Sequence, residues 1–337
     1  MEEKQLLAQI RNLSVEYKTR LGQVSAVDGV SFDIYKGEIL GLVGESGCGK
    51  STMGKALMRM IQPPGKITDG QIIFQGEDIM TYDDNQMRDF RGRKVSMIFQ
   101  DPMTSLNPTQ RVDEHIIEAI QVHESQTKTE EALTRAEKMI RKLGMQRRRM
   151  NSYPHQLSGG MRQRVMVGLG LVLNADLIVA DEATTSLDVI VEAQLADQLK
   201  DIREEFGVSL LVITHNIALV AEISDRIVVM YAGHVMEIAD VEPIFDNPLH
   251  PYTRGLLKSI PNIKLVDTEE LYKMPGEPPN LTHPPSGCRF HPRCPRAMPI
   301  CKTYEPDLEE VSSGRFVKCW LYIDHPEKES ETIKVEA

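Results

Sequence analysis

The sequence lacks a long run of apolar residues. Its longest stretch without a strongly polar side chain, Val165 to Leu173, is far shorter than the roughly 18 residues that suggest a membrane-spanning helix. The first residues, Met1 to Gln5, are acidic, whereas a signal peptide would be basic and then apolar. We therefore expect a cytoplasmic protein that does not cross a bilayer.

The sequence also lacks an excess of positive charge. It has 39 Lys and Arg against 49 Asp and Glu in 337 residues, a net charge of −10. A general electrostatic attraction to nucleic acid or anionic lipid is therefore not expected, and any bound anion must be held by a local arrangement of groups. The chain is 41% hydrophobic and 26% charged, and together with its length this predicts about two folded domains.

Cysteine and proline are scarce over most of the chain. Only five of the 19 prolines precede Pro243, and four of the five cysteines follow residue 287. This shift predicts a boundary between residues 243 and 262, with domains over residues 1–255 and 256–337. Because proline interrupts helices and central strands, we expect the second domain to be an irregular, Cys-rich extension stabilised by something other than regular structure.

Short apolar segments alternate with helical segments along the first domain, which predicts a layered α/β fold. We expect a helix over 50–61 and strands over these ranges: 38–43, 71–74, 95–99, 177–180, 209–213 and 227–230. The α/β core is interrupted by a helical insertion over about 101–165.

The helical insertion is predicted from apolar residues that recur at helical spacing, namely Leu133, Ala136, Ile140 and Leu143. Thr129 is the expected N-cap of this helix, and Gly144 is the expected stop.

A phosphate-binding motif follows the first predicted buried strand. Gly44-Glu45-Ser46-Gly47-Cys48-Gly49-Lys50-Ser51-Thr52 fits G-x-x-x-x-G-K-[ST] between a strand and a helix. Its glycines allow backbone N–H groups to surround phosphate oxygens at a helix N-terminus. Lys50 would contact the β- and γ-phosphates, and Ser51 would bind Mg²⁺. The nucleotide-binding residues expected here are Gly44, Ser46, Gly47, Gly49, Lys50, Ser51 and Thr52, and we interpret Cys48 as a small filler.

Two carboxylates end the predicted strand over 177–180. Asp181 can hold Mg²⁺ through water, and Glu182 can orient or deprotonate the water that attacks the γ-phosphate. In isolation, this motif would be better explained as a buried strand ending in a solvated acidic loop. The preceding phosphate loop favours the catalytic interpretation.

Leu157-Ser158-Gly159-Gly160-Met161-Arg162-Gln163-Arg164 resembles the signature sequence of ATP-binding cassette (ABC) ATPases, with Met161 in place of the commoner glutamine. The resemblance covers residues 5–255 and implies a RecA-like core, an antiparallel β subdomain and a helical subdomain. It also implies that signatures and phosphate loops of two subunits enclose two ATP molecules in a head-to-tail dimer. Physically, the signature is a second helix start suited to anion binding, through Ser158, Gly159 and Gly160.

The other motifs of the ABC family follow in order. Gln100 resembles the Q-loop glutamine, a catalytic and Mg²⁺-binding residue, and Asp188 belongs to a segment that resembles the D-loop. His215 resembles the catalytic switch histidine, and Tyr17 stands where the family stacks an aromatic ring on adenine. Ordinary structural roles, a solvent-facing histidine and a core aromatic, are the alternatives for the last two.

The segment from Asn247 to Leu257 resembles the ATP-binding subunits of oligopeptide and dipeptide importers. Its His250 and Tyr252 have no chemical role that we can assign from the sequence. We expect them to pack at the junction between the cassette and the proline-rich tail.

The last four cysteines, Cys288, Cys294, Cys301 and Cys319, are expected to bind a metal. The paired C-x-x-C spacing of zinc ribbons is absent, and thiolate chemistry alone leaves zinc and an iron–sulfur cluster about equally supported. Resemblance to the peptide-importer subunits favours a 4Fe–4S cluster. Two disulfides are the remaining alternative, which a reducing cytosol disfavours, and His283 and His291 are not in the expected ligand set.

These expectations predict an ATPase that binds ATP and Mg²⁺ and powers import of short peptides from the cytoplasmic face of the membrane. The resemblance implies separate integral membrane permease subunits, a second ATPase subunit and, indirectly, an extracytoplasmic peptide-binding protein. Residues 100–125 are the expected surface for the permease. The solute, peptide or nickel or another, and the choice between homodimer and heterodimer stay open.

The alternative is a soluble ABC ATPase acting on nucleic acid or ribosomes. It predicts long heptad insertions or two cassettes, and the sequence has neither. A tail that binds nucleic acid through its metal is disfavoured as well, because its basic surplus is only two charges over residues 287–320.

Overall fold

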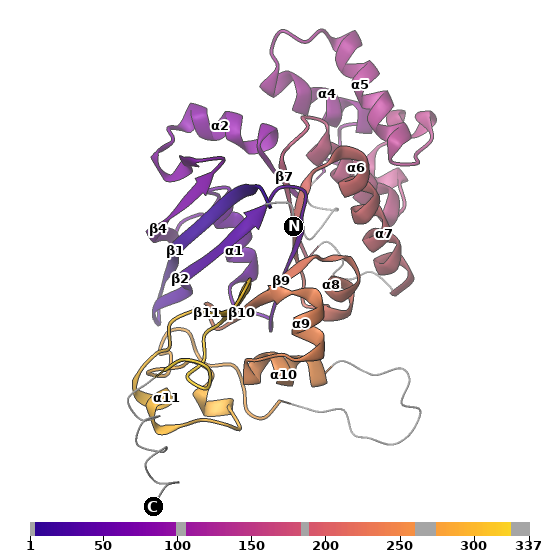
Figure 1. Ribbon diagram of the computed structural model, residues 1–337. Coiled ribbons are helices and arrows are strands. Elements are labelled where there is room, and N and C mark those ends of the chain that lie inside the picture. The colour runs from indigo at the N-terminus through magenta and orange to yellow at the C-terminus, as the bar shows by residue number, and fades with distance from the viewer. Residues whose placement is uncertain (1–3, 99–105, 183–188, 260–273, 325–337) are drawn as a thin grey trace, which may run out of the picture. The chain divides into compact units, whose positions relative to one another are not determined.

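The computed structural model describes residues 4–98, 106–182, 189–259 and 274–324 of the chain (Figure 1). They belong to two compact units. The first comprises residues 1–6, 35–39 and 78–213, and the second comprises residues 7–34, 40–77 and 214–337. Each is described by itself.

The second unit contains an antiparallel sheet and the mixed sheet that carries the phosphate loop. The antiparallel sheet has the order β2 (Gly22–Tyr35), β1 (Leu6–Thr19), β4 (Gly65–Phe74) and β5 (Glu77–Asp78). Strand β1 pairs with β4 from Ala8 opposite Phe74 to Tyr17 opposite Gly65. Alternate residues of β1 are buried, as expected for a sheet with one face on a core. This sheet confirms the antiparallel part of the expected α/β cassette.

The mixed sheet of this unit is built around β3 (Ile39–Val43), all of whose residues are buried. Strand β3 runs parallel to β9 (Arg226–Tyr231), and β9 pairs antiparallel with β10 (His234–Asp240). Burial on both faces is typical of parallel strands, which explains why the run Ile39-Leu40-Gly41-Leu42-Val43 was readable as a strand. The helices of this unit before the tail are α1 (Lys50–Leu57), α8 (Ile217–Ile223), α9 (Val241–Asp246) and α10 (Pro251–Lys258). The first of them ends four residues before the predicted end at Ile61.

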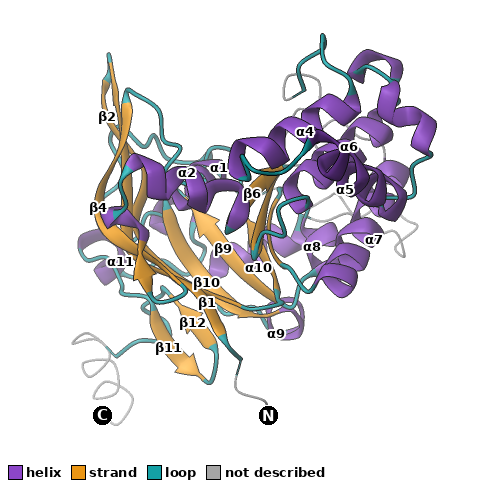
Figure 2. Ribbon diagram, turned by 90° about the horizontal axis from the view of Figure 1, so that it is seen from above, coloured by secondary structure: helices purple, strands orange, loops and turns teal. Residues whose placement is uncertain are grey.

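The tail is more regular than the sequence predicted. It forms η4 (His291–Arg293), α11 (Pro299–Thr303) and the hairpin β11 (Glu309–Ser312) and β12 (Arg315–Val317). Strand β12 pairs with β10, so the hairpin extends the mixed sheet (Figure 2). The prediction of an irregular extension was therefore wrong for these short elements. Of the two strands, β12 pairs with β10, and β11 pairs with β12.

The first unit has three parallel strands in the order β6 (Val95–Ile98), β7 (Leu177–Asp181) and β8 (Ser209–Ile213). Two of its helices, over 112–123 and 129–142, lie within residues 101–165, where a helical insertion was predicted. The α-helices of this unit are α2 (Asp84–Arg93), α4 (Val112–His123), α5 (Thr129–Lys142), α6 (Gly159–Leu171) and α7 (Val189–Phe206). Helices α4, α5 and α6 pack on one another (Figure 1), and the short 3₁₀ turns are η1 (Ile79–Thr81), η2 (Arg147–Asn151) and η3 (Pro154–Gln156).

Two details of α5 differ from the prediction. Thr129 is its first helical residue, and the N-cap is Lys128, which makes no side-chain cap. Leu133 is 38% exposed, because the buried face carries Ala132, Ala136, Met139 and Ile140. Gly144 has φ of +68° just beyond the helix, which confirms it as the stop.

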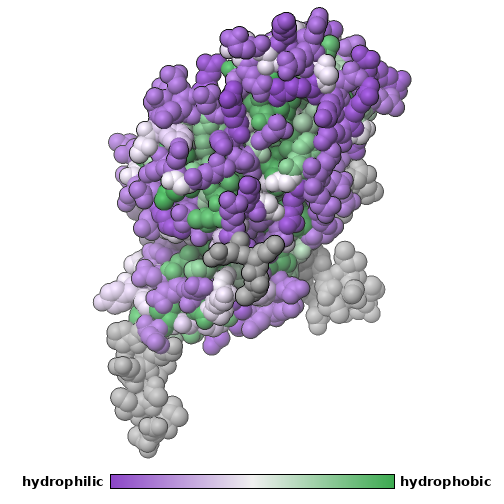
Figure 3. Space-filling view, turned by 45° about the horizontal axis from the view of Figure 1, so that its top comes forward, coloured by the Kyte–Doolittle hydropathy of each residue, from purple (hydrophilic) through white to green (hydrophobic). Residues whose placement is uncertain are grey.

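Polar and charged side chains cover most of the face seen in Figure 3. No helix in the described ranges is both long enough and apolar enough to cross a membrane.

Candidate functional site

The phosphate loop of the second unit joins β3 to α1, as the sequence predicted. Its glycines Gly44, Gly47 and Gly49 have φ of 154°, 77° and 105°, and Gly49 is the N-cap of α1. At Gly44 an added Cβ would lie 2.1 Å from the carbonyl oxygen of Met230, and at Gly49 it would lie 2.1 Å from that of Ala26. Only glycine fits these two positions, because a side chain would collide with backbone that cannot rotate away.

Lys50 opens α1 and is the central cation of this loop. It is 4% exposed, and its Nζ donates to the carbonyl oxygens of Gly44 at 2.8 Å and Glu45 at 3.0 Å. Ser51 and Thr52 follow in the first turn and are half-buried. A buried ammonium and two hydroxyl groups at a helix N-terminus are suited to bind phosphate oxygens and Mg²⁺.

Two side chains that the sequence did not identify as parts of the site bind the loop at Glu45. Tyr252 accepts a hydrogen bond from the Glu45 backbone N–H at 2.9 Å. Arg293 donates to both carboxylate oxygens of Glu45, at 2.7 Å and 3.0 Å. The expectation that Tyr252 packs at a junction is right, since it is fully buried, but the expectation did not include contact with the phosphate loop.

His250, the other residue singled out beside Tyr252, is a buried helix cap. Its Nδ1 accepts from the Tyr252 backbone N–H at 3.0 Å at the start of α10. Burial lowers the pKa of His250 to about 3, so the imidazole is neutral at physiological pH. This is the packing role expected from the sequence.

Tyr17 and His215 also belong to the second unit. Tyr17 is half-buried on β1, and its ring lies so close to Gly65 that a Cβ there would be 2.4 Å from ring carbon Cε1. His215 is exposed just before Asn216, the N-cap of α8. Their assigned roles toward adenine and the γ-phosphate stay predictions.

In the first unit, β7 ends in the two predicted carboxylates. All five residues of β7, including Asp181, are buried. Glu182 has φ of +46°, a conformation that costs energy in a residue with a Cβ and that gathers at functional sites. Its backbone N–H donates to the Ile213 carbonyl at 2.8 Å, which fixes the direction in which its side chain leaves the strand.

The signature residues lie at the start of α6 in the first unit, as expected. Ser158 is the N-cap, and its hydroxyl accepts from the Met161 backbone N–H at 3.4 Å. Among the described residues, no neighbour lies within 4 Å of a Cβ added at Gly159 or Gly160. This helix start is open on its glycine side, as an anion-binding surface must be.

Two predicted residues, Gln100 and Asp188, lie outside the described residues. So does the beginning of the expected permease surface, residues 100–105, whereas α4 is described. The phosphate loop, Tyr17 and His215 belong to one unit, and Asp181, Glu182 and the signature belong to the other.

The four tail cysteines belong to the second unit. Cys288, Cys301 and Cys319 are buried, and Cys294 is half-buried; the Cys288 backbone N–H donates to the Cys301 carbonyl at 2.9 Å. Burial first, and then the charges of the other thiolates, raise the pKa of Cys288 to about 11 and that of Cys319 to about 12. All five cysteines are free thiols. The described residues contain no group of three or more His, Cys, Asp or Glu side chains already arranged around a metal position.

A chain of ion pairs joins the tail to the rest of the second unit. His234 is buried at the start of β10, and its Nδ1 is 2.9 Å from Glu305, which also pairs with Lys318 at 2.6 Å. The other ring nitrogen of His234 lies 3.4 Å from Asp28, and Asp28 also pairs with Arg289. The tail is therefore held by charges as well as by packing.

This network predicts acid sensitivity. The proximity of His234, aided by Arg289, lowers the pKa of Asp28 to about 2. Burial alone would raise the pKa of the Glu305 carboxyl. His234 and Lys318 lower it by more, so that the pKa of Glu305 is also about 2. Because the unfolded values are about 4, these carboxylates stabilise the fold fully above about pH 5 and lose that contribution as the pH falls toward 2.

Thermal unfolding of the Glu305→Gln variant tests this sensitivity. The variant should melt a few degrees below wild type at pH 6, and the difference should shrink by pH 3, because the unfolded wild-type chain is then protonated at this carboxyl and the ionised form in the fold stabilises it less. Glu309→Gln, an exposed substitution in β11, should match wild type throughout. A difference between Glu305→Gln and wild type that stays constant from pH 6 to pH 3 would contradict the prediction.

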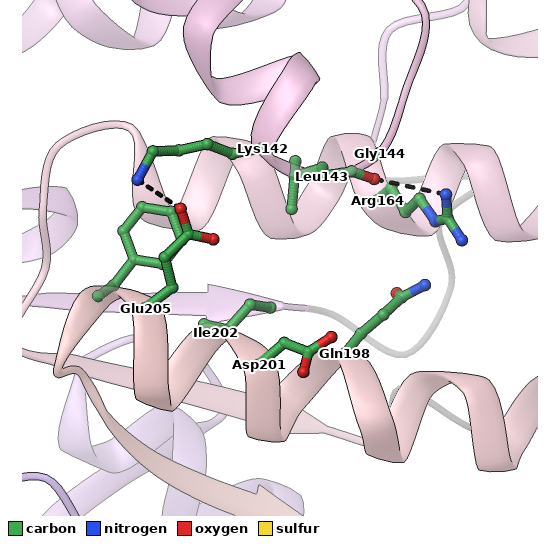
Figure 4. A pocket seen from close by; sticks show the side chains of 9 residues that line it. Lys142, Leu143, Gly144, Arg164, Gln198, Asp201, Ile202 and Glu205 are labelled. Atoms are coloured by element: carbon green, nitrogen blue, oxygen red, sulfur yellow. Dashed lines mark hydrogen bonds and ion pairs between the residues drawn. The ribbon is translucent and has the colours of Figure 1, made fainter.

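The first unit also contains a pocket of about 230 Å³. Figure 4 shows Lys142 pointing to Glu205 across it, a pair 2.7 Å apart, and Arg164 donating to the Leu143 carbonyl at 3.4 Å. None of the site residues predicted from the sequence lines this pocket.

Comparison with known proteins matches two families. The family described as ABC transporter matches residues 27–185, and the oligopeptide/dipeptide transporter C-terminal region matches residues 236–301. The oligopeptide transport ATP-binding protein OppD of Bacillus subtilis is 44% identical over 324 residues, which cover 95% of this chain and 90% of OppD. The dipeptide transport ATP-binding protein DppD of the same organism is 44% identical, with 93% of each chain covered. OppD of Escherichia coli is 42% identical, with 94% of each chain covered.

Among solved structures, the chain resembles the dimeric ATP-binding cassette MJ0796 bound to ADP and Pi. The TM-score is 0.62 with 28% identity, and the match covers 70% of this chain and 99% of that one. The structure of cbiO1 from Clostridium perfringens, at 23% identity and a TM-score of 0.63, supports the fold alone.

Proposed function

This chain belongs to the ABC transporter family of ATP-binding proteins, and from that premise we propose that it hydrolyses ATP to power the import of short peptides. The observation that carries the peptide assignment is the similarity to OppD and DppD, which extends over almost the whole chain and includes the C-terminal region. The cassette match alone does not name a solute, whereas residues 236–301 match the C-terminal region of oligopeptide/dipeptide transporters. Nothing in the comparisons supports the alternative of action on nucleic acid or ribosomes.

The proposed roles follow the chemistry of each group. Lys50 and the loop N–H groups bind the phosphates, and Ser51 and Gln100 bind Mg²⁺ together with Asp181 acting through water. Glu182 orients the attacking water, and His215 contacts the γ-phosphate. Tyr17 stacks on the adenine ring. The signature residues Ser158 to Gly160, with Asp188, complete the ATP site of a second ATPase subunit in a head-to-tail dimer.

We further propose that the subunit acts at the cytoplasmic face of the membrane, bound to separate permease subunits through residues 100–125. Affinity purification of the tagged chain from native membranes tests this proposal. The expected result is co-purification of integral membrane proteins together with an extracytoplasmic peptide-binding protein, and loss of labelled dipeptide uptake in cells without the chain. Recovery of no integral membrane protein would contradict it.

We propose that the chain has two domains, residues 1–255 and 256–337. The proposed role of the second domain is to bind a 4Fe–4S cluster. Cys288 and Cys301 belong to one buried cluster against which Cys294 packs, Cys319 is also buried, and the donor set suits iron–sulfur chemistry. Bound metal would stabilise the thiolate form of these cysteines, whose burial otherwise favours the thiol. Zinc remains the alternative for the same ligands.

Metal analysis of anaerobically purified protein tests the cluster. Iron and acid-labile sulfide should each be near about four per chain, whereas a zinc site would give about one zinc. Cys301→Ser should lose the iron and melt at a lower temperature, because it removes a proposed ligand. Cys48→Ser is the matched control, since that cysteine lies in the phosphate loop, and it should keep the full iron content. Absence of both iron and zinc would contradict a metal-binding tail.

A further inference from the structure

The phosphate loop is held on its outer side by the cysteine-rich tail. Glu45 is the second residue of the motif, and Arg293 immediately precedes Cys294. Both belong to the second unit. The Arg293 side chain is 5% exposed and Glu45 is 23% exposed, so the pair is more shielded than the surface ion pairs that contribute little. Its two-pronged geometry is the strong form of an arginine–carboxylate contact.

Arg293 is itself fixed by several partners. Its Nε donates to the Pro275 carbonyl at 2.9 Å, and Nη1 donates to the Tyr231 hydroxyl at 3.2 Å as well as to Glu45. The guanidinium carbon lies 5.7 Å from the centre of the Tyr231 ring, a cation–π distance. All three guanidinium nitrogens are thus engaged, and the group has one defined position.

An aromatic cluster connects this arginine to the other contact of the loop. Phe290 lies edge-on to Tyr231, with ring centres 5.2 Å apart, and 5.4 Å from Tyr252. The Tyr252 hydroxyl oxygen in turn accepts a hydrogen bond from the Glu45 backbone N–H. The Glu45 carbonyl accepts from Lys50, so all three polar groups of Glu45 are bound. The residue links the tail directly to the cation of the phosphate site.

Without Arg293, the Glu45 carboxylate would be an uncompensated negative charge one residue from Gly44, in a loop that must accept the phosphates of ATP. Repulsion between the two anions would act through a partly desolvated region, where it is screened less than in bulk water. The loop would also lose the contact that orients its first residues.

We propose that Arg293 is a positioning residue for ATP binding, which neutralises and holds Glu45 so that the phosphate loop receives the nucleotide. This inference rests on the proposed function of the loop and deepens it, because it makes the C-terminal tail a determinant of ATP affinity. Arg293 acts through Glu45 and does not itself contact the nucleotide.

A double-variant cycle on the full-length chain tests the proposal. ATP affinity is measured by displacement of a fluorescent ATP analogue from wild type, Arg293→Gln, Glu45→Gln and the double variant. Arg293→Gln should raise the Kd by about tenfold, equivalent to about 1.4 kcal/mol, and this loss should diminish with added salt. The double variant should bind ATP more tightly than Arg293→Gln, because it has no unpaired carboxylate beside the phosphates, and Glu45→Gln measures the effect of losing the orienting contact without that negative charge.

Steady-state kinetics distinguishes a role in positioning the loop for ATP from a general loss of activity. Arg293→Gln should raise the KM for ATP while kcat at saturating ATP changes by less than about threefold. Arg296→Gln, an exposed arginine three residues along, is the matched control and should bind ATP as wild type does. The melting temperature of each variant identifies any loss of folding.

The proposal is overturned if Arg293→Gln binds ATP as wild type does, or if the double variant binds no better than Arg293→Gln. In the second case the arginine stabilises the tail without acting through Glu45. Normal ATP binding by Lys50→Ala would instead contradict the assignment of the phosphate loop itself. The two failures are therefore distinguishable.

Discussion

Replacing Glu182 with glutamine is expected to reduce ATP turnover by about a hundredfold or more, the usual contribution of a general base. ATP binding should change by less than about threefold, because the amide leaves the phosphate loop and Lys50 unaltered. The backbone at Glu182 is held at φ of +46° by its hydrogen bond to Ile213, and glutamine preserves the shape of the side chain. The substitution therefore removes the charge that orients water and little else.

Phosphate release at saturating ATP measures the loss of turnover. Equilibrium binding measures the retained ATP affinity, and size-exclusion chromatography measures dimer formation. With ATP and Mg²⁺ present, the variant should accumulate as a dimer if, as proposed, ATP closes the dimer and hydrolysis reopens it. Glu204→Gln, an exposed change in α7 of the same unit, should turn over ATP at the wild-type rate. Turnover of Glu182→Gln within tenfold of wild type would exclude Glu182 as the catalytic carboxylate.

The parts of the site that could be predicted are those that one short stretch of sequence determines by itself. Strand β7 was readable because a strand buried on both faces must be a run of apolar residues, and its end is marked by Asp181. The phosphate loop was readable because Gly44 and Gly49 meet backbone oxygens that exclude any side chain. In both places one short segment carries the whole constraint.

The helix α5 shows where local information is ambiguous. Leu133 and Ala132 begin equally regular helical patterns, and only packing against α4 and α6 selects the face that carries Ala132, Ala136, Met139 and Ile140. Its start was misplaced for a similar reason. Glu130 and Glu131 favour the helix N-terminus through the dipole, so the helix can begin at Thr129 without a side-chain cap.

Contacts between distant residues were not predictable. Tyr252 is 207 positions from Glu45, and Arg293 is 248 positions from it. Nothing in the sequence around Tyr252 or Arg293 indicates a contact with a residue so far away in the chain. The same holds for the hairpin β11–β12, since β12 pairs with the distant strand β10.

Replacing Lys50 with alanine is expected to raise the Kd for ATP by about a hundredfold. The ammonium is 4% exposed and bound to the Gly44 and Glu45 carbonyls, so it is already positioned at the loop and needs little reorganisation to meet phosphate. Charge-assisted hydrogen bonds to phosphate are about twice as strong as neutral ones, and alanine provides none. The loss should be greater for ATP than for ADP, because the proposed role of Lys50 is to contact the β- and γ-phosphates.

Competition binding with ATP and ADP measures both affinities, and Lys55→Ala, an exposed change on the same helix, provides the control. If Lys50→Ala binds ATP as wild type does, the phosphate assignment fails. A comparison with Arg293→Gln then adds a further step. Lys50→Ala should weaken ATP binding more than ADP binding at any salt concentration. Arg293→Gln instead leaves the negative charge of Glu45 uncompensated, and its effect should decline as salt increases. Different responses to salt would separate a group that binds the phosphates from one that positions the loop.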